Sequence, residues 1–133
     1  MARRLFHALT RNAVATAEDH WDSRLRGRTY AIPFEKVWQA SLALANGGLR
    51  RWKVISSDDY EGVINAESKT LFWRFKDDVV IRVYLDENAQ TRVDLESRSR
   101  KGAADFGANA RRVHRFLRAL DRKLMPPAKK PAR

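Results

Sequence analysis

A polar stretch near the C-terminal end of the chain carries the residue types that could bind an anion. Hydroxyl, guanidinium, carboxylate and amide side chains lie there, just before and within the first turns of a predicted helix. A helix start attracts anions, because its first backbone N–H groups have no partner inside the helix and its dipole is positive at that end. Arginine adds a planar fork of donors that matches a carboxylate or a phosphate. We therefore predict an anion or ligand site from Ser97, Arg98, Ser99, Arg100, Asp105, Asn109 and Arg112, with Asp78 or Arg82 as further members.

The same stretch also allows a purely structural interpretation. The carboxylate of Asp105 can cap the helix by accepting backbone N–H groups of its first turn. The ion pairs that would hold sheet and helix together join Arg100 or Arg112 to Asp77 or Asp78. Alternation along the preceding strand favours this interpretation, since it sends the two serines to one face and the two arginines to the other.

Other combinations of reactive side chains do not form a catalytic or metal site. The chain has no Cys, so zinc thiolates, disulfides and cysteine nucleophiles are excluded. Its three histidines, His7, His20 and His114, lie on separate predicted elements without the spacing of metal ligands. The adjacent acids at 58–59 and 77–78 fall at predicted turns, and neighbours on a strand point to opposite faces rather than converge. We predict no catalytic residues, no metal and no cofactor, and hence a protein that is not an enzyme.

The helix that follows the polar stretch has two contrasting faces. Apolar residues recur along one face at intervals of three and four, which is the period of a helix packed on a core. They are Phe106, Ala110, Val113, Leu117, Leu120 and Leu124. Arginines fall within a narrow arc on the opposite face, namely Arg111, Arg115, Arg118 and Arg122. We expect this basic face to contact water or an anion.

The positive charge of the chain is concentrated in its C-terminal part. The net charge is +11, and residues 97–133 hold 12 Lys and Arg against 2 acids, whereas residues 1–96 hold 15 against 14. A basic helix and tail of this kind could attract nucleic acid or an anionic membrane surface. The alternative is a solvated arginine face without a partner.

The polar stretch and the strand before it resemble a bacterial family catalogued as domain of unknown function 1499. The resemblance rests on the segments 77–83 (DDVVIRV), 97–102 (SRSRKG) and 105–112 (DFGANARR), followed by a C-terminal helix. It is close over 60–121 and weaker from residue 28 onward. Glu96 departs from the family pattern, which more often has Arg there, and the family's Cys-containing segment near the start is missing. The resemblance implies no activity, because the family has no established one.

The rest of the chain supplies the elements that must position this stretch. Residues 28–32 are predicted as a strand and 34–46 as a core helix, which ends at the stop signal Asn46-Gly47-Gly48. Between 50 and 99 the apolar period changes to two, with turn residues between short segments, which predicts a meander of about five antiparallel strands. We therefore predict an α+β fold, an antiparallel sheet of about five to six strands with a core helix and a long C-terminal helix packed on one face. This order is similar to the helix-grip arrangement.

Three parts are expected along the chain: an N-terminal amphipathic arm over 1–27, a single α+β domain over 28–124, and a disordered basic tail over 125–133. In the arm, Phe6, Leu9, Ala13, Ala17 and Trp21 stand at helical spacing, which predicts a helix. No apolar run is long enough to span a membrane and no signal-peptide core is present, so we expect a cytoplasmic location.

Two functions remain open at this stage. The first is a ligand-binding or protein-interaction module with an anion site at the start of the C-terminal helix, whose partner is a small anionic ligand or a protein. The second is a non-specific nucleic-acid-binding protein that uses the basic helix face. An enclosed apolar pocket between helix and sheet would favour the first, and a continuous basic surface with exposed aromatic residues would favour the second.

Overall fold

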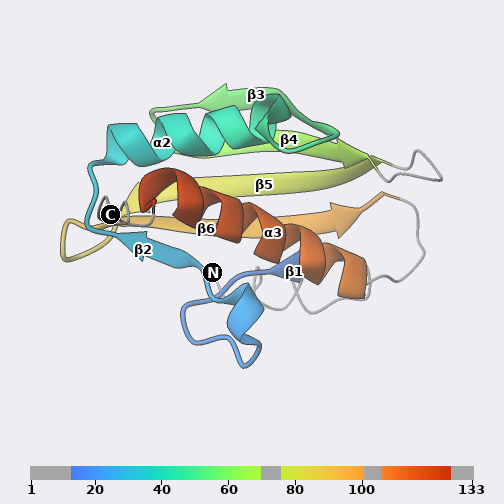
Figure 1. Cartoon of the computed structure of the whole chain (residues 1–133), viewed down its shortest axis with the longest axis horizontal. Helices are drawn as coiled ribbons and strands as arrows, with labels where there is room; N and C mark the ends of the chain where they lie inside the picture. The colour runs from blue at the N-terminus through green and yellow to red at the C-terminus, as the bar shows by residue number, and fades with distance from the viewer. Residues whose placement is uncertain (1–12, 70–75, 101–105, 127–133) are drawn as a thin grey trace, which may run out of the picture.

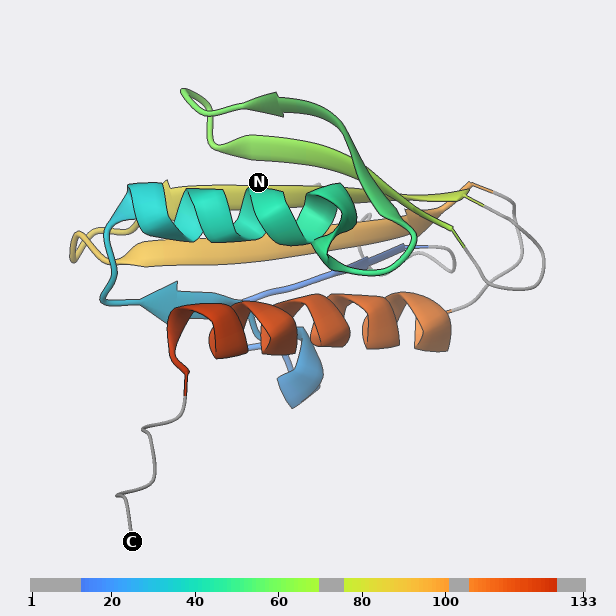
Figure 2. The same cartoon turned by 45° about the horizontal axis from the view of Figure 1, so that its top comes forward.

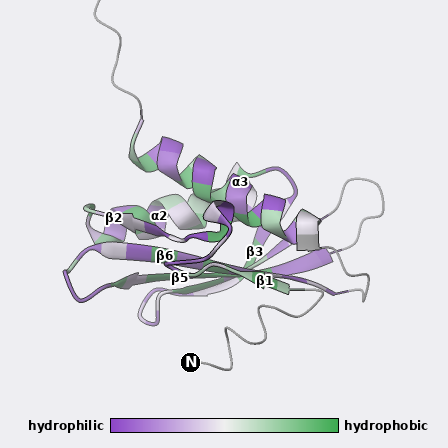
Figure 3. Cartoon of the chain, turned by 90° about the horizontal axis from the view of Figure 1, so that it is seen from below, coloured by the Kyte–Doolittle hydropathy of each residue, from purple (hydrophilic) through white to green (hydrophobic). Residues whose placement is uncertain are grey.

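One six-stranded antiparallel sheet with two helices on one of its faces makes up the computed structural model, which describes residues 13–69, 76–100 and 106–126 (Figures 1 and 3). The strands are β1 (Ala13–Ala15), β2 (Arg28–Tyr30), β3 (Trp52–Asp58), β4 (Val63–Lys69), β5 (Lys76–Leu85) and β6 (Thr91–Ser99). The helices are α2 (Phe34–Ala43) and α3 (Phe106–Leu124), with short helical turns η1 (Ser23–Leu25) and η2 (Leu44–Gly48). The predicted α+β class, with a core helix and a long C-terminal helix, is confirmed.

The described chain begins at one edge of the sheet, passes to the opposite edge through α2, and comes back through neighbouring strands. β1 and β2 pair end to end with the same edge of β6, at residues 96–98 and 91–93 respectively. α2 then carries the chain to the opposite edge, where β3 begins a meander through β4, β5 and β6 (Figures 1 and 2). The end of β6 lies close to the first turns of α3, and this brings the predicted polar stretch together.

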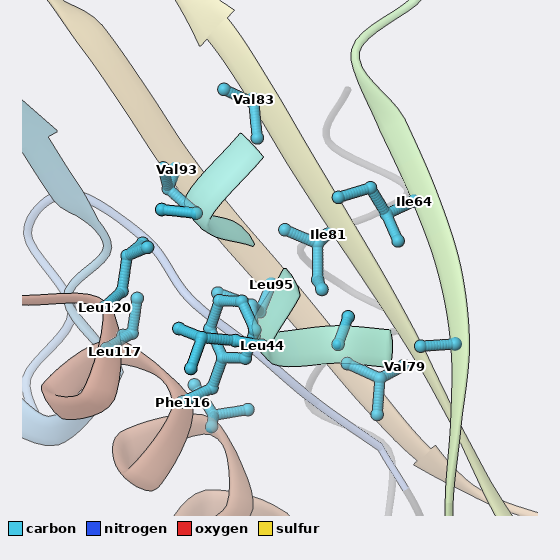
Figure 4. Close-up of a cluster of buried hydrophobic side chains, with 14 of the residues drawn as sticks. Leu44, Ile64, Val79, Ile81, Val83, Val93, Leu95, Phe116, Leu117 and Leu120 are labelled. Atoms are coloured by element: carbon cyan, nitrogen blue, oxygen red, sulfur yellow. The ribbon is translucent and has the colours of Figure 1, made fainter. Parts of the chain in front are cut away.

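Side-chain alternation gives the sheet a covered and an uncovered face. Val79, Ile81 and Val83 of β5 and Val93 and Leu95 of β6 pack under the helices, together with Ile64 of β4 (Figure 4). Ala66 of β4 is buried in the same core. α3 contributes Ala110, Val113, Leu117 and Leu120 of the predicted stripe, and Phe116, all of them fully buried. Leu124 is partly buried, and the side chain of Phe106 lies outside the described parts. Burying one large apolar side chain stabilises by about 1.5–3 kcal/mol. Packing on the sheet therefore holds α3 in place.

The N-terminal part of the described chain differs from the prediction. Helical spacing predicted a helix within 1–27, but residues 13–15 form β1 and residues 23–25 form η1, while residues 1–12 lie outside the described parts. The physical reason is the edge of β6, whose backbone groups pair with β1 while Ala13 and Val14 become buried. A strand of the sheet thus lies within the stretch that was expected to be a separate arm.

Most other boundaries agree with the sequence pattern, but the acids at 77–78, predicted to lie at a turn, are paired within β5 on both sides. α2 continues into a last turn that ends at Asn46-Gly47-Gly48, with Gly47 at φ 97°, a backbone conformation that favours glycine. The predicted strand residues at 71–75, the predicted cap Asp105 and the tail beyond residue 126 lie outside the described residues. In the described parts of the chain, no helix has both the length and the apolar character of a membrane span.

Candidate functional site

The polar stretch predicted from the sequence forms a buried cluster between α3 and the sheet. Its centre is the guanidinium of Arg112, whose side chain is 11% exposed. Arg112 Nη2 donates to Asp77 Oδ2 at 2.6 Å, and Arg112 Nε donates to Ser68 Oγ at 3.2 Å. These acceptors belong to β5 and β4, so one helical side chain is bonded to two neighbouring strands.

β6 and α3 itself contribute further partners to the same guanidinium. Arg112 Nη1 donates to Asn109 Oδ1 at 2.7 Å and to Ser97 Oγ at 3.1 Å. Ser97 Oγ donates to Asn109 Oδ1 at 2.7 Å, and Asn109 Nδ2 donates to Ser99 Oγ at 3.0 Å. Ser97 and Asn109 are fully buried. We call this set the Arg112 cluster: Ser68, Asp77, Ser97, Ser99, Asn109 and Arg112.

The cluster forms where the covered face of the sheet runs out of apolar residues. On β6, two serines follow Val93 and Leu95 on that face. The same change occurs on the neighbouring strands at Ser68 and Asp77, which are partners in the register of β4 and β5. The first turns of α3 meet this end of the sheet. The core therefore changes here from apolar packing to hydrogen bonds.

The contacts of the Arg112 cluster are those of a structural link. Of the five N–H donors of a guanidinium, four make the hydrogen bonds described above. An incoming anion would also meet the carboxylate of Asp77, whose side chain is only 6% exposed. The predicted structural pairing of a helix arginine with the acid of the sheet is confirmed for Arg112 and Asp77.

The other predicted arginines lie apart from this cluster. Alternation places Arg98 on the uncovered face of the sheet, where it pairs with Glu96 at 3.3 Å. Arg100 pairs with Asp78 at 2.6 Å and with Glu67 at 2.5 Å. Hydrogen bonds with Asp78 and Glu67 raise the pKa of Arg100, and the bond from Arg100 lowers the pKa of Glu67. The predicted site is therefore divided between the two faces of the sheet.

Sequence reasoning does not identify two acceptors on β4. Ser68 accepts from Arg112, and Glu67 accepts from Arg100. The sequence does contain a signal for Ser68, because Ser68 follows Ile64 and Ala66 in the alternating positions of β4 that face the helices. The serines of β6 follow its buried apolar residues in the same way. Glu67 has no comparable signal, since its position beside Asp78 depends on the register between β4 and β5.

The uncovered face of the sheet carries a hollow of about 490 Å³ beside β1. Its lining combines the apolar Ala15, Val80 and Leu95 with polar groups that include Tyr84 and Asp94. The hollow lies on the face away from the helices, whereas residues on the covered face are packed into the core. This hollow is therefore not the enclosed pocket between helix and sheet that would favour a ligand-binding module, because it lies outside the helix layer.

Asp94 is the centre of the hydrogen bonds at this hollow. Thr16 Oγ1 and the Tyr84 hydroxyl each donate to it at 2.7 Å, and Arg92 donates at 2.9 and 3.0 Å. Arg92 also donates to Thr29 Oγ1 at 3.1 Å. Burial, followed by the bond to Asp94, raises the pKa of Tyr84 to about 12. A carboxylate accepts about four hydrogen bonds, so Asp94 fixes the edge strands and has little capacity left for a ligand.

The arginines predicted for the outer face of α3 form a row on the surface. Arg111, Arg115, Arg118 and Arg122 are all exposed, and none of them makes an ion pair with a described acid. We call these four residues the arginine row. Other arginines are paired with Asp or Glu, namely Arg24, Arg28, Arg92, Arg98, Arg100 and Arg112. The row is thus a free basic surface on a firmly packed helix.

Asp121, the acidic residue of α3, accepts hydrogen bonds from two residues of β2. Asp121 Oδ2 accepts from Arg28 Nε at 2.9 Å, and Asp121 Oδ1 accepts from the Tyr30 hydroxyl at 2.7 Å. Tyr30 is 1% exposed, and burial, followed by the bond to Asp121, raises its pKa. These bonds anchor the C-terminal half of the helix and leave the arginine row without a counter-charge on α3.

The loop of residues 17–27 packs against the same helix through η1. Asp22 caps η1 by accepting from the backbone N–H of Arg24 at 3.0 Å, and the Arg24 side chain lowers the pKa of Asp22 to about 2. On α3, burial and three nearby arginines lower the pKa of His114. Its Nδ1 is buried and has no hydrogen-bond partner among the described residues.

Within residues 13–69, 76–100 and 106–126, no three side chains of His, Cys, Asp or Glu lie together in a way that could hold a metal ion.

Comparison with known proteins gives a family but no characterised relative. The family model described as "Protein of unknown function (DUF1499)" matches residues 8–120. This match confirms the resemblance seen in the sequence and extends it to a point well before residue 28. No curated protein and no solved structure matches the chain.

Proposed function

The chain belongs to the DUF1499 family, whose description names no activity, and we propose that it is a non-catalytic binding module that holds the phosphate backbone of nucleic acid on the arginine row of α3. The observation that carries this proposal is the row itself, four exposed guanidinium groups on one helix face without an acid partner in the described parts of the chain. Six arginines elsewhere are paired within the protein. Charge that the fold leaves unpaired is available to an outside anion.

The dimensions of the row fit a chain of phosphates. From Arg111 to Arg122 the helix rises by about 16.5 Å, at about 1.5 Å per residue. One strand of a duplex carries one phosphate per about 3.4 Å of axis, so the row spans about five phosphates. Four arginines in single file match one line of negative charges better than a broad anionic plane.

The same geometry favours binding without base readout. A recognition helix reads bases by placing several residue types against base edges in the major groove. The exposed residues among those described in α3 are Arg111, Arg115, Arg118, Arg122 and Lys123, all of them cationic, and the opposite face of the helix is buried in the core. Contacts to phosphate position a protein on nucleic acid but carry no sequence information. We therefore expect non-specific affinity, with a Kd of roughly 10⁻⁴–10⁻⁶ M at physiological salt.

Two double variants of equal charge test this proposal. Arg115→Gln with Arg118→Gln removes two charges from the row, and Arg50→Gln with Lys53→Gln removes two exposed charges at the opposite edge of the sheet. In anisotropy titrations with a labelled oligonucleotide at low salt, the row variant should bind roughly 10- to 30-fold more weakly, at about 1 kcal/mol per exposed charge contact. The control variant should stay within about threefold of wild type on the same reasoning. Equal losses in the two variants would reduce the effect to net charge and contradict the proposal.

A small ligand in the hollow of the uncovered face is a second candidate function. Small-molecule sites are typically about 300–1,000 Å³ and mostly apolar, and the hollow has about 490 Å³ with apolar lining from three strands. Two acids of its lining are paired, Asp94 with Arg92 and Glu96 with Arg98, and the lining also includes Glu61 and Arg82. The apolar part of the lining supports an uncharged, largely apolar molecule as the occupant.

Filling the hollow tests the second candidate. Val80→Trp would occupy it, whereas Ile55→Trp adds the same ring at an exposed position on β3, outside its lining. An uncharged solvatochromic dye should fluoresce strongly with wild type and with Ile55→Trp, and weakly with Val80→Trp. Equal dye fluorescence in the two variants would exclude the hollow as the binding site.

A further inference from the structure

Trp21 is an exposed aromatic side chain without a packing role in the core. It is 76% exposed, whereas Trp38 and Trp52 are 3% and 6% exposed. Its described ring contact is with the neighbouring His20, at 5.5 Å between ring centroids. Tryptophan is buried on average, and a large exposed aromatic ring is more informative than an exposed aliphatic side chain. The indole ring is therefore available to a partner.

The loop that carries Trp21 is anchored beside α3. Ala17 N donates to Leu25 O at 3.0 Å, and Arg26 Nε donates to His20 O at 2.7 Å, so the loop is closed by its own hydrogen bonds. Leu25 is fully buried, and η1 packs against α3 (Figures 1 and 2). Trp21 is thus presented from a fixed position next to the helix that carries the arginine row.

The charges of the loop indicate which part of this surface binds phosphate and which part makes an aromatic contact. Glu18 and Asp19 are exposed just before Trp21, and the loop as a whole holds three acids against two arginines, so it attracts phosphate far less than the arginine row does. On α3, His114 lies close enough to Asp22 and Arg24 of the loop for their charges to act on it, and at 100° per residue it stands only about 40° around the helix from Arg118. Phosphates are therefore best placed on the row, and the loop is left with an aromatic contact.

We infer that the arginine row and Trp21 form one binding surface for single-stranded nucleic acid, in which the row holds phosphates and the indole ring stacks on a base. This inference rests on the proposed function and names its substrate class. In a duplex the base faces are covered by their neighbours, whereas the bases of a single strand can be splayed out onto aromatic side chains. Stacking of this kind tolerates any sequence, because every base has a π-face.

An anionic membrane surface is the competing occupant, since Trp and Arg together also suit a lipid interface. The apolar stripe of α3 is buried in the core, so the helix cannot insert as an amphipathic helix does. A bilayer would be held by charge and by the one indole ring alone. The narrow row and the single ring fit a strand of nucleic acid better, and vesicles form one arm of the test.

The test compares a mixed-sequence single strand of about ten nucleotides with its duplex in anisotropy titrations at low salt. The proteins are wild type, Trp21→Ala, Trp21→Phe and Tyr60→Ala, where Tyr60 is 93% exposed in the turn between β3 and β4 at the far edge of the sheet. Trp21→Ala should weaken single-strand binding by roughly fivefold or more. Trp21→Phe should retain most of the affinity, and Tyr60→Ala should change it by less than about twofold, because only Trp21 stacks on a base. Duplex binding should be unchanged in all three variants.

The outcomes separate this inference from the proposed function. If Trp21→Ala weakened single-strand and duplex binding equally, or if it changed neither of them, the stacking contact would be refuted. The proposed function would then still stand, provided that Arg115→Gln with Arg118→Gln lost binding. If wild type bound neither polymer, both would fail. Binding to anionic lipid vesicles that exceeded single-strand binding and fell with Trp21→Ala would overturn the inference in favour of membrane contact.

Discussion

Replacing Arg112 with Ala tests whether the buried cluster holds α3 to the sheet. The side chains of Arg112 and Asp77 are 11% and 6% exposed, and their charged atoms are 2.6 Å apart. Removing one partner of such a buried pair leaves the other charge uncompensated, which typically costs about 3–5 kcal/mol. The change also removes the donors to Ser68, Ser97 and Asn109. We therefore expect a loss at the upper part of the range for single substitutions.

Urea denaturation followed by far-UV circular dichroism measures this loss. A decrease of about 3–5 kcal/mol is a large fraction of the roughly 5–15 kcal/mol that stabilises a domain. At an m-value of about 2 kcal/mol/M, the midpoint should fall by roughly 1.5–2.5 M. Arg111→Ala is the matched control, because Arg111 is the adjacent residue on the same helix, is exposed and has no described ion pair. Its effect should be no more than about 0.5 kcal/mol.

A double replacement distinguishes loss of the ion pair from loss of volume. Arg112→Met with Asp77→Leu removes both charges and keeps the side chains long, and buried pairs replaced in this way often leave stability unchanged or improved. The double variant should therefore recover most of what Arg112→Ala loses. If Arg112→Ala and Arg111→Ala unfolded at the same urea concentration with the same m-value, the reasoning about the cluster would be refuted and its role as an anion site would regain support.

Three further predictions follow from the packing of α3. Leu117→Ala should cost about 2–5 kcal/mol and Arg118→Ala no more than about 0.5 kcal/mol, and equal effects on thermal unfolding would mean that the helix faces the other way. Tyr30→Phe should cost about 1.5–3 kcal/mol, because the hydroxyl donates to the charged Asp121, and an unchanged melting temperature would contradict this. The folded-state pKa of His114 lies below its ordinary value of 6.5, so the unfolded chain takes up this proton first and stability falls as pH drops through about 6.5. His114→Phe should show a smaller loss of stability between about pH 7.5 and 5.5 than wild type, and identical pH dependence in the two proteins would exclude the histidine as a source.

Regular periods explain which elements could be predicted from the sequence. β6 and α3 each have one buried face with an unbroken period over many residues, so the boundaries Thr91–Ser99 and Phe106–Leu124 follow from the pattern. The exposure of the arginine row follows in the same way, because it lies opposite a stripe that is buried. β1 could not be predicted, since it has only three residues and its conformation depends on an edge of β6 that is far away in sequence.

Contacts between elements explain what the sequence left open at the site. Alternation correctly separated the serines of β6 from its arginines, and pairing of Arg112 with Asp77 was one of the alternatives. The choice among the acids depends on the register of β5 against β6, which places Asp77 opposite Ser99 on the covered face. The surroundings of Trp21 depend on how the loop of residues 17–27 docks on α3, and no periodic signal within this loop reports that docking.

The dependence of nucleic-acid affinity on salt concentration tests the central claim most directly. If the four arginines each contact one phosphate of a single strand, the plot of log Kobs against log salt should be linear with a slope near −2.8, at about −0.7 per contact. Arg115→Gln with Arg118→Gln should bring the slope to about −1.4, while Arg50→Gln with Lys53→Gln should leave it at the wild-type value. A wild-type slope near zero, or the same slope in the row variant and in wild type, would contradict the assignment of phosphate binding to the arginine row.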